Sequence, residues 1–120
     1  MGIRALGRLA PDLPQYASFD TAFHATNPDV ARRYALPARA EGLGIKRYGF
    51  HGLSYVNLTA RLPRIIGGPL PERVLALHLG NGASICAIRQ GKSVATSMGY
   101  SPLEGLTMGT RTGGIDGNAV

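Results

Sequence analysis

The chain has 120 residues, which corresponds to one modest domain and excludes a complete two-domain enzyme. Hydrophobic residues make up 44% of it, which favours a globular protein over a disordered one, and 17 glycines predict many turns. The formal net charge of +6 comes mostly from scattered arginines, which do not alternate with aromatic residues as in a nucleic-acid stacking surface. We therefore expect no nucleic-acid partner, while a basic module that binds RNA or another polyanion stays an alternative.

Cysteine content and hydropathy limit the class further. Cys86 is the single cysteine, so an intrachain disulfide and a multi-cysteine metal site are excluded, and its place in ASICAIR predicts an inert core thiol. No apolar run approaches the ~20 residues that span a bilayer. Residues 1–14 also lack the continuous apolar stretch of a signal peptide. We expect no membrane partner and a cytoplasmic location.

The first half of the chain predicts little regular structure. Residues 2–18 contain two prolines and no sustained apolar period, which suggests the end of a preceding unit. Residues 29–36 predict a short helix that begins at Asp29 and is stopped by Pro37. Residues 45–50, IKRYGF, predict a brief strand after two glycines.

Asp20 lies between Phe19 and Phe23, so its charge needs a partner if the side chain is buried. The simplest structural interpretation is a cap for the turn that begins at Thr21. His24, one turn later, is placed to pair with Asp20 and is interpreted as structural support.

A longer helix is predicted to begin with Ser54 as its cap. Its apolar face is formed at helical spacing by Tyr55, Leu58, Leu62 and Ile66. Pro63 removes one helical hydrogen bond, so the helix should kink or end in its last turn.

The second half predicts an antiparallel meander. The strands VLALHL, ASICAIR and SVATSM are joined by the turns GNG and QGK. Such a sheet needs helices on both faces, and within residues 1–120 only the helix beginning at Ser54 is available to cover one of them. We therefore predict an α/β fold in which one sheet face lacks its cover.

Two glycine-rich segments could hold a phosphate. His78, Leu79, Gly80, Asn81 and Gly82 form a bend whose N–H groups are not obstructed by side chains, although Asn-Gly alone is more typical of a plain hairpin turn. Arg111, in MGTRTGG, lies on a loop able to deliver a guanidinium to phosphoryl oxygens, with a surface arginine as an equal alternative. His51 comes directly before the longer helix, where backbone N–H groups favour anions.

The candidate residues lie within a series of six motifs, which occur in the order FDTAFH, RYGFHGLS, HLGNGAS, GKSVATSMG, SPLEGL and GTRTG. In their order and spacing the chain resembles the acetokinase family of short-chain carboxylate kinases, over essentially its whole length. The resemblance implies part of an actin-like fold, of the sugar kinase, Hsp70 and actin superfamily. Residues 1–20 would be the tail of the N-terminal domain, and residues 21–120 the first part of the C-terminal, nucleotide-binding domain.

The resemblance also implies an activity: transfer of the ATP γ-phosphoryl group to acetate with Mg²⁺, in a homodimer. Asp20 matches the family's active-site aspartate, and His51 and Arg111 match residues that stabilise the transition state. Residues His78 through Gly82 match the ATP-phosphate loop. Phe50 and Pro102 fall where the pocket for the acetate methyl group would be.

Acetate is already ionised at neutral pH, so Asp20 has no proton to remove. We expect it to position Mg²⁺ or a cationic partner, and we assign no residue as a metal ligand.

The chain departs from the family pattern at a few positions. Tyr55 stands where the family usually repeats a histidine, Gly114 where an aspartate is common, and Gly117 where a proline is frequent. The resemblance covers only the middle of a longer protein, so we expect this chain alone to be inactive. A propionate or butyrate kinase, and a truncated gene product without an independent role, are the remaining alternatives.

Overall fold

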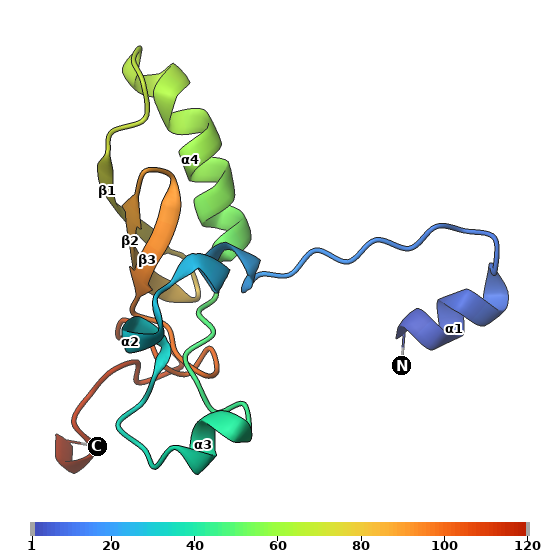
Figure 1. The fold of residues 1–120 in the computed structure, drawn as a ribbon. Coiled ribbons are helices and arrows are strands. Elements are labelled where there is room, and N and C mark those ends of the chain that lie inside the picture. The colour runs from blue at the N-terminus through green and yellow to red at the C-terminus, as the bar shows by residue number, and fades with distance from the viewer. Residues whose placement is uncertain (1, 120) are drawn as a thin grey trace.

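The computed structural model describes residues 2–119, and Figure 1 shows their arrangement. The elements, in chain order, are α1 (Gly2–Leu9), the 3₁₀-helix η1 (Ala22–Thr26), α2 (Asp29–Arg32), α3 (Arg39–Gly42), α4 (Gly52–Ile66), β1 (Arg73–Leu79), β2 (Ala83–Arg89), β3 (Lys92–Thr96) and the 3₁₀-helix η2 (Gly117–Ala119). Within residues 2–119, no helix is both long and apolar enough to span a membrane.

The predicted meander is confirmed as a three-stranded antiparallel sheet of order β1-β2-β3. The turn between β2 and β3 uses Gln90 and Gly91, both with positive φ (50° and 76°), which is the backbone of a type I′ hairpin turn. The turn between β1 and β2 begins after the pair Leu79 and Ala83. The GNG segment is therefore a hairpin turn, and this geometry leaves its phosphate-binding role open.

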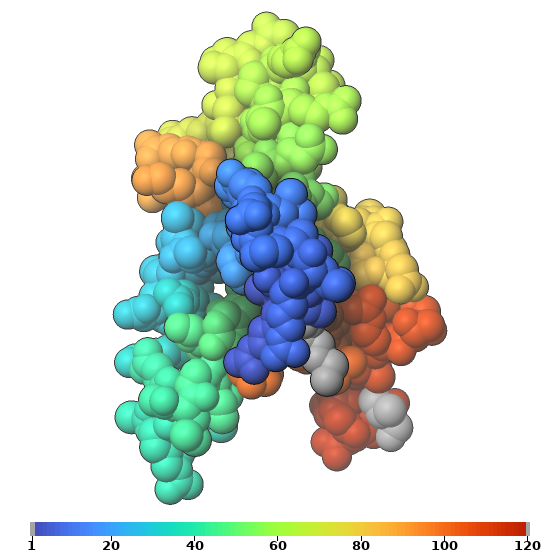
Figure 2. Space-filling view, turned by 90° about the vertical axis from the view of Figure 1, so that its right-hand side faces the viewer, coloured from blue at the N-terminus to red at the C-terminus, as the bar shows by residue number. Residues whose placement is uncertain are grey.

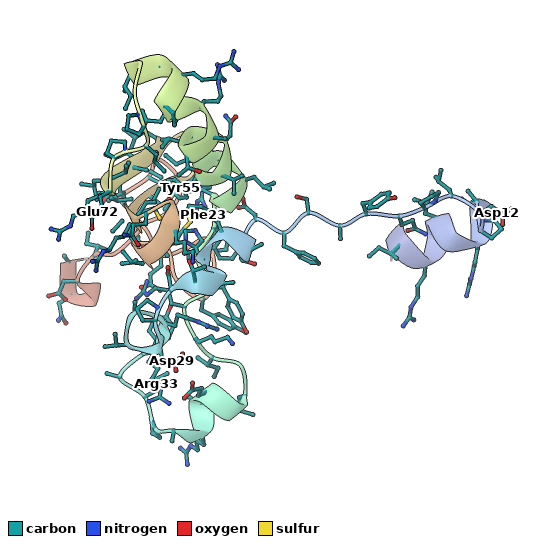
Figure 3. The ribbon with its side chains drawn as sticks, turned by 45° about the horizontal axis from the view of Figure 1, so that its top comes forward. Asp12, Phe23, Asp29, Arg33, Tyr55 and Glu72 are labelled. Carbon is teal, nitrogen blue, oxygen red and sulfur yellow. The ribbon has the colours of Figure 1, made fainter. Side chains whose placement is uncertain are left out.

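The core lies between α4 and one face of the sheet. Tyr55 of α4 is fully buried against Ala76, Cys86 and Ile88, with Phe23 at its side (Figure 3). Cys86 is 0% exposed, so its predicted place in the core is confirmed, and burial raises the pKa of its thiol.

The opposite face of the sheet is apolar and exposed. Leu75, Leu77 and Leu79 of β1 alternate onto this face and are 65%, 49% and 70% exposed. The prediction that one sheet face lacks a cover is therefore confirmed for the described residues.

η1 packs against β3 and is fixed there by His24, which is 3% exposed. The His24 ring bonds to Ser93 Oγ through Nδ1 (2.8 Å) and to the Phe50 carbonyl through Nε2 (2.9 Å). His24 makes no hydrogen bond with Asp20, because both ring nitrogens are occupied by these partners, and Asp20 acts on the ring only through its charge. Structural support remains the role of His24.

The N-terminal segment contains a helix that the sequence did not predict. α1 has no buried residue, and the chain after it runs as an extended arm to the body of the molecule (Figure 1). In Figure 2 this arm points toward the viewer in front of the body. Ile3 and Leu6 at helical spacing were the available signal, but the nearby Pro11 masked so short a period.

Between η1 and α4 two predictions are wrong. The helix predicted over 29–36 ends at Arg32, because Arg33 takes an extended backbone (ψ 143°) and the Tyr34 hydroxyl bonds to Glu104 and to the N–H of Tyr100. Residues 45–50 form no strand, because Tyr48 and Gly49 both donate to the Gly99 carbonyl instead of entering a ladder. The short helix α3 was not predicted.

The predicted long helix is observed, with different ends. α4 begins at Gly52, so Ser54 is not its cap and lies inside the first turn. Pro63 lies in the last turn, and the helix continues to Ile66 before Gly67 ends it in the left-handed conformation (φ 68°).

Replacing Gly49 with alanine should strongly destabilise the chain. Gly49 has φ +71°, and a Cβ there would lie 2.6 Å from His24 Cδ2 and 2.7 Å from Thr96 Cγ2. We expect Gly49→Ala to lower the free energy of unfolding in urea by roughly 2–5 kcal/mol, combining left-handed strain with overpacking. Gly67→Ala is the matched control, since φ is +68° with open space around it, and should cost only about 1–2 kcal/mol. Equal losses in the two variants would contradict the close packing at Gly49.

Candidate functional site

Asp20 ties the start of the body to the N-terminus of α4. Its carboxylate accepts hydrogen bonds from the backbone N–H of His51 (2.7 Å) and of Leu53 (3.3 Å), and its carbonyl accepts from the N–H of Gly52 (2.8 Å). Asp20 therefore caps α4, where a negative charge is also favoured by the helix dipole. The interpretation as a cap for the turn at Thr21 is wrong, since that turn has no side-chain cap.

His51 precedes α4 in the left-handed conformation, with φ 60° and ψ 19°. This backbone is uncommon for a residue with a Cβ, and the hydrogen bond from its N–H to Asp20 helps to hold it. The His51 ring stacks on that of His78, with 3.9 Å between centroids and 21° between planes. His51 Nδ1 bonds to Ser84 Oγ at 2.8 Å.

His78 ends β1 on the side of the sheet that faces α4. Its Nδ1 bonds to Ser54 Oγ at 3.0 Å, which explains why a polar side chain lies in the first turn of α4. Its Nε2 approaches Gly80, since a Cβ at Gly80 would lie 3.3 Å from it. His78 thus connects the helix to the GNG turn.

Arg111 reaches the same turn from a distant loop. Its guanidinium donates to the carbonyl of Asn81 (3.0 Å, from Nη2) and to the carbonyl of Pro102 (2.8 Å, from Nη1). The side chain is half-buried and forms no ion pair with a described residue. The guanidinium keeps further N–H donors for an anion.

Gly82 is where these groups meet. A Cβ at Gly82 would lie 2.6 Å from His51 Nε2 and 3.2 Å from Arg111 Nη2. Because Gly82 has no side chain, the imidazole of His51 and the guanidinium of Arg111 both approach its backbone closely and leave no room for a Cβ. Two such donors around one point suit a negatively charged group.

The electrostatics keep His51 neutral near pH 7. Burial is the main cause that lowers its pKa below the usual 6.5, and the neighbouring His78 lowers it further. Asp20 opposes these effects, and Arg111 adds a smaller effect that lowers the pKa. A neutral imidazole can still donate one hydrogen bond, from the nitrogen that carries the proton.

The remaining predicted residues are placed differently. The Leu79 side chain is exposed on the uncovered face of the sheet, so only its backbone belongs to the turn. Pro102 contributes its carbonyl to Arg111, and Phe50 contributes its carbonyl to His24. Among residues 2–119 there is no cluster of three or more histidine, cysteine or acidic side chains that could hold a metal ion by itself.

Sequence reasoning missed the hydroxyl groups of the site. Ser84 bonds to His51 and also to the Tyr55 hydroxyl, which is 2.5 Å away. Ser84 follows the GNG turn directly in the motif HLGNGAS, and the alternation of β2 places it on the face of the sheet that His78 shares. That alternation was the signal that could have identified it.

On this α/β fold a histidine and an arginine therefore converge on the hairpin turn of an antiparallel sheet, an arrangement that suits an anion. The chain belongs to the acetokinase family, whose family model matches residues 1–120. The family resemblance seen in the sequence is therefore confirmed.

Individual relatives agree with this assignment. An acetate kinase of Halothermothrix orenii is 56% identical over 117 residues, which are 96% of this chain and 29% of the relative. An acetate kinase of Staphylococcus epidermidis is 50% identical over 118 residues, which are 97% of this chain and 28% of the relative. The chain thus spans less than a third of the length of these relatives.

Solved structures show the same fold. The Porphyromonas gingivalis acetate kinase matches with a TM-score of 0.86 at 44% identity, over 98% of this chain and 30% of that one. A propionate kinase from Francisella tularensis matches with a TM-score of 0.87 at 44% identity, over 98% and 31%. The predicted fold class, a partial α/β structure of this family, is confirmed.

The buried His24 and the half-buried His51 should make stability depend on pH. Burial lowers the pKa of His24 and of His51 below 6.5, so the folded chain binds fewer protons than the unfolded chain just below that pH. Stability conferred by the neutral rings is present at higher pH and is lost as the pH falls. We expect the free energy of unfolding to decrease from pH 7.5 to about pH 5.5.

The measurement is urea unfolding across that range, together with NMR titration of the imidazole C–H protons. Both rings should titrate below 6.5. Stability that stays flat or increases as the pH is lowered would contradict the buried, neutral state of these histidines.

Proposed function

We propose that this chain is the phosphoryl-handling part of a kinase that transfers the γ-phosphoryl group of ATP to acetate. The observation that carries the proposal is the convergence of His51 Nε2 and Arg111 Nη2 on Gly82 of the hairpin turn. Membership of the acetokinase family and the names of the relatives support acetate as the acceptor.

The geometry suits this reaction. An acetate oxygen attacks the γ-phosphorus, the bond from phosphorus to the bridging oxygen breaks, and ADP leaves with that electron pair. Acetate is ionised at neutral pH, so no base is needed. Arg111 and neutral His51 are proposed to donate to the equatorial oxygens, on which charge is spread during transfer.

The backbone of His78 through Gly82 is proposed to hold the nucleotide phosphates. His78 and Arg111 fix the two ends of this turn through Ser54 and through the Asn81 carbonyl. The Gly80 N–H already donates to the Gly82 carbonyl at 3.0 Å, so the N–H groups of Asn81 and Gly82 are the ones proposed to bind the phosphates. Phe50 and Pro102 are proposed to flank the acetate methyl group.

Asp20 is proposed to position Mg²⁺ or a cationic group. Mg²⁺ commonly binds one or two protein carboxylates together with waters and substrate phosphates, so a single carboxylate fits this role. Mg²⁺ would neutralise charge on the phosphates when bound. The cap that Asp20 forms on α4 uses part of its acceptor capacity and holds the carboxylate beside His51.

The domain arrangement is proposed from the way the chain joins its body. α1 buries no side chain, and Asp20 is where hydrogen bonds to α4 begin. Residues 1–20 would then complete an N-terminal actin-like domain, and residues 21–120 would open the nucleotide-binding domain. For the complete protein we propose a cytoplasmic homodimer that acts on small molecules, without a nucleic-acid or membrane partner.

Propionate is the second candidate substrate, favoured by the similarity to the Francisella propionate kinase. A single methylene changes transition-state binding by about 1–3 kcal/mol, so a slightly larger pocket would change the preference. The ratio of kcat/KM for acetate and propionate, measured in the chimaera described below, separates the two.

This chain alone should show no acetate-dependent turnover of ATP. It spans less than a third of its relatives, and catalysis by positioning fails when positioning groups are absent. A coupled assay that detects ADP would check this, with the Halothermothrix acetate kinase as the positive control. Turnover by the purified chain, absent from Arg111→Ala, would contradict the expectation.

The role of Arg111 is testable in a chimaera in which this chain replaces the matching segment of the Halothermothrix relative. We expect Arg111→Ala to lower kcat by about 10³-fold or more, because a transition-state charge partner is removed. Arg64→Ala, an exposed arginine on α4, is the matched control and should leave kcat unchanged. A loss below about tenfold for Arg111→Ala would remove it from the reaction.

A further inference from the structure

A buried line of hydroxyl groups ends on the His51 ring. Tyr55, on the buried face of α4 (Figure 3), places its hydroxyl 2.5 Å from Ser84 Oγ, and Ser84 Oγ lies 2.8 Å from His51 Nδ1. Tyr55 and Ser84 are both 0% exposed. With no access to solvent, the protons of these groups must be shared among the groups themselves.

The direction of the protons follows from the Tyr55 end. Ser84 Oγ is the only hydrogen-bond partner of the Tyr55 hydroxyl among the described residues. Burial raises the pKa of Tyr55, so the hydroxyl keeps its proton at neutral pH. A buried O–H with a single partner donates to that partner, so the Tyr55 proton is directed to Ser84 Oγ.

Each hydroxyl has a single proton to donate. If Tyr55 donates to Ser84 Oγ, the Ser84 proton is directed to the remaining partner, His51 Nδ1. His51 Nδ1 is then an acceptor, and the single proton of the neutral ring lies on Nε2. Nε2 is the ring nitrogen that lies beside Gly82.

We infer that Tyr55 and Ser84 are positioning residues that hold His51 in the Nε2–H form and so present an N–H donor at Gly82. The inference rests on the proposed function for the identity of the acceptor, a phosphoryl oxygen. The tautomer itself is a property of the chain without any ligand. This role also gives a reason for tyrosine at position 55, where the family usually has a histidine: both side chains can donate to a serine.

The test is the ¹⁵N NMR spectrum of the imidazole rings at pH 7.5, in the 120-residue chain. The nitrogen shifts distinguish an N–H from a bare ring nitrogen and so report the tautomer of His51. We expect the Nε2–H form to predominate. The Nδ1–H form, or the mixture typical of free imidazole, would overturn the inference.

Two variants then interrupt the series of hydrogen bonds from Tyr55 to His51 at different residues. Tyr55→Phe keeps the ring that fills the core, and Ser84→Ala removes the direct partner of Nδ1. Both should shift His51 toward a mixture of tautomers, read in variants that keep the amide dispersion of the sheet. Thr59→Ala is the matched control: it deletes a hydroxyl of α4 that bonds only to the carbonyls of Tyr55 and Val56, and should leave the tautomer unchanged. An unchanged tautomer in both Tyr55→Phe and Ser84→Ala would overturn the inference.

Titration with pyrophosphate separates this inference from the proposed function. If His51 has the expected tautomer while the amides of Gly80, Asn81 and Gly82 do not shift, the positioning role stands and the phosphate site fails. If those amides shift while His51 has the Nδ1–H form, the phosphate site stands and the positioning role fails.

Discussion

The arrangement of the site depends on the hydrogen bonds that Asp20 makes at the start of α4. They link the end of the extended arm to the helix, and they hold the backbone of His51 in a left-handed conformation that it would not adopt by itself. In that conformation the His51 ring lies on His78 and beside the GNG turn. A carboxylate that the resemblance assigns to the active site is therefore also a structural requirement of the fold.

Around this cap, the site is assembled from elements far apart in sequence. α4 supplies Tyr55 and Ser54, β1 and β2 supply His78 and Ser84, and a distant loop supplies Arg111. The hydroxyl groups of Tyr55 and Ser84 are buried, while the charged guanidinium of Arg111 stays half-exposed. This division follows the cost of burying each kind of group, and it keeps positive charge at the edge of the site where an anion can enter.

The sequence predicted the sheet and α4 because alternation, the QGK turn and helical spacing each have a local cause. It also placed Arg111 and the GNG turn at one site, through the motifs of a family. Sequence reasoning failed where tertiary contacts determine the local structure. The helix that begins at Asp29 ends before Arg33, and the next residue, Tyr34, bonds to Glu104 and to the N–H of Tyr100. The cap at α4 was beyond local reasoning, because Asp20 lies 31 residues before its partner His51.

The hydrogen bonds that Arg111 makes in the unliganded chain affect the thermodynamics of anion binding. Its guanidinium already lies on two neutral carbonyls, so much of the rotamer entropy of the side chain, about 2 kcal/mol for a free arginine, is lost during folding. An incoming anion then exchanges neutral acceptors for a charged one and has little ordering left to impose. Association at this point should therefore be driven by enthalpy and be sensitive to ionic strength.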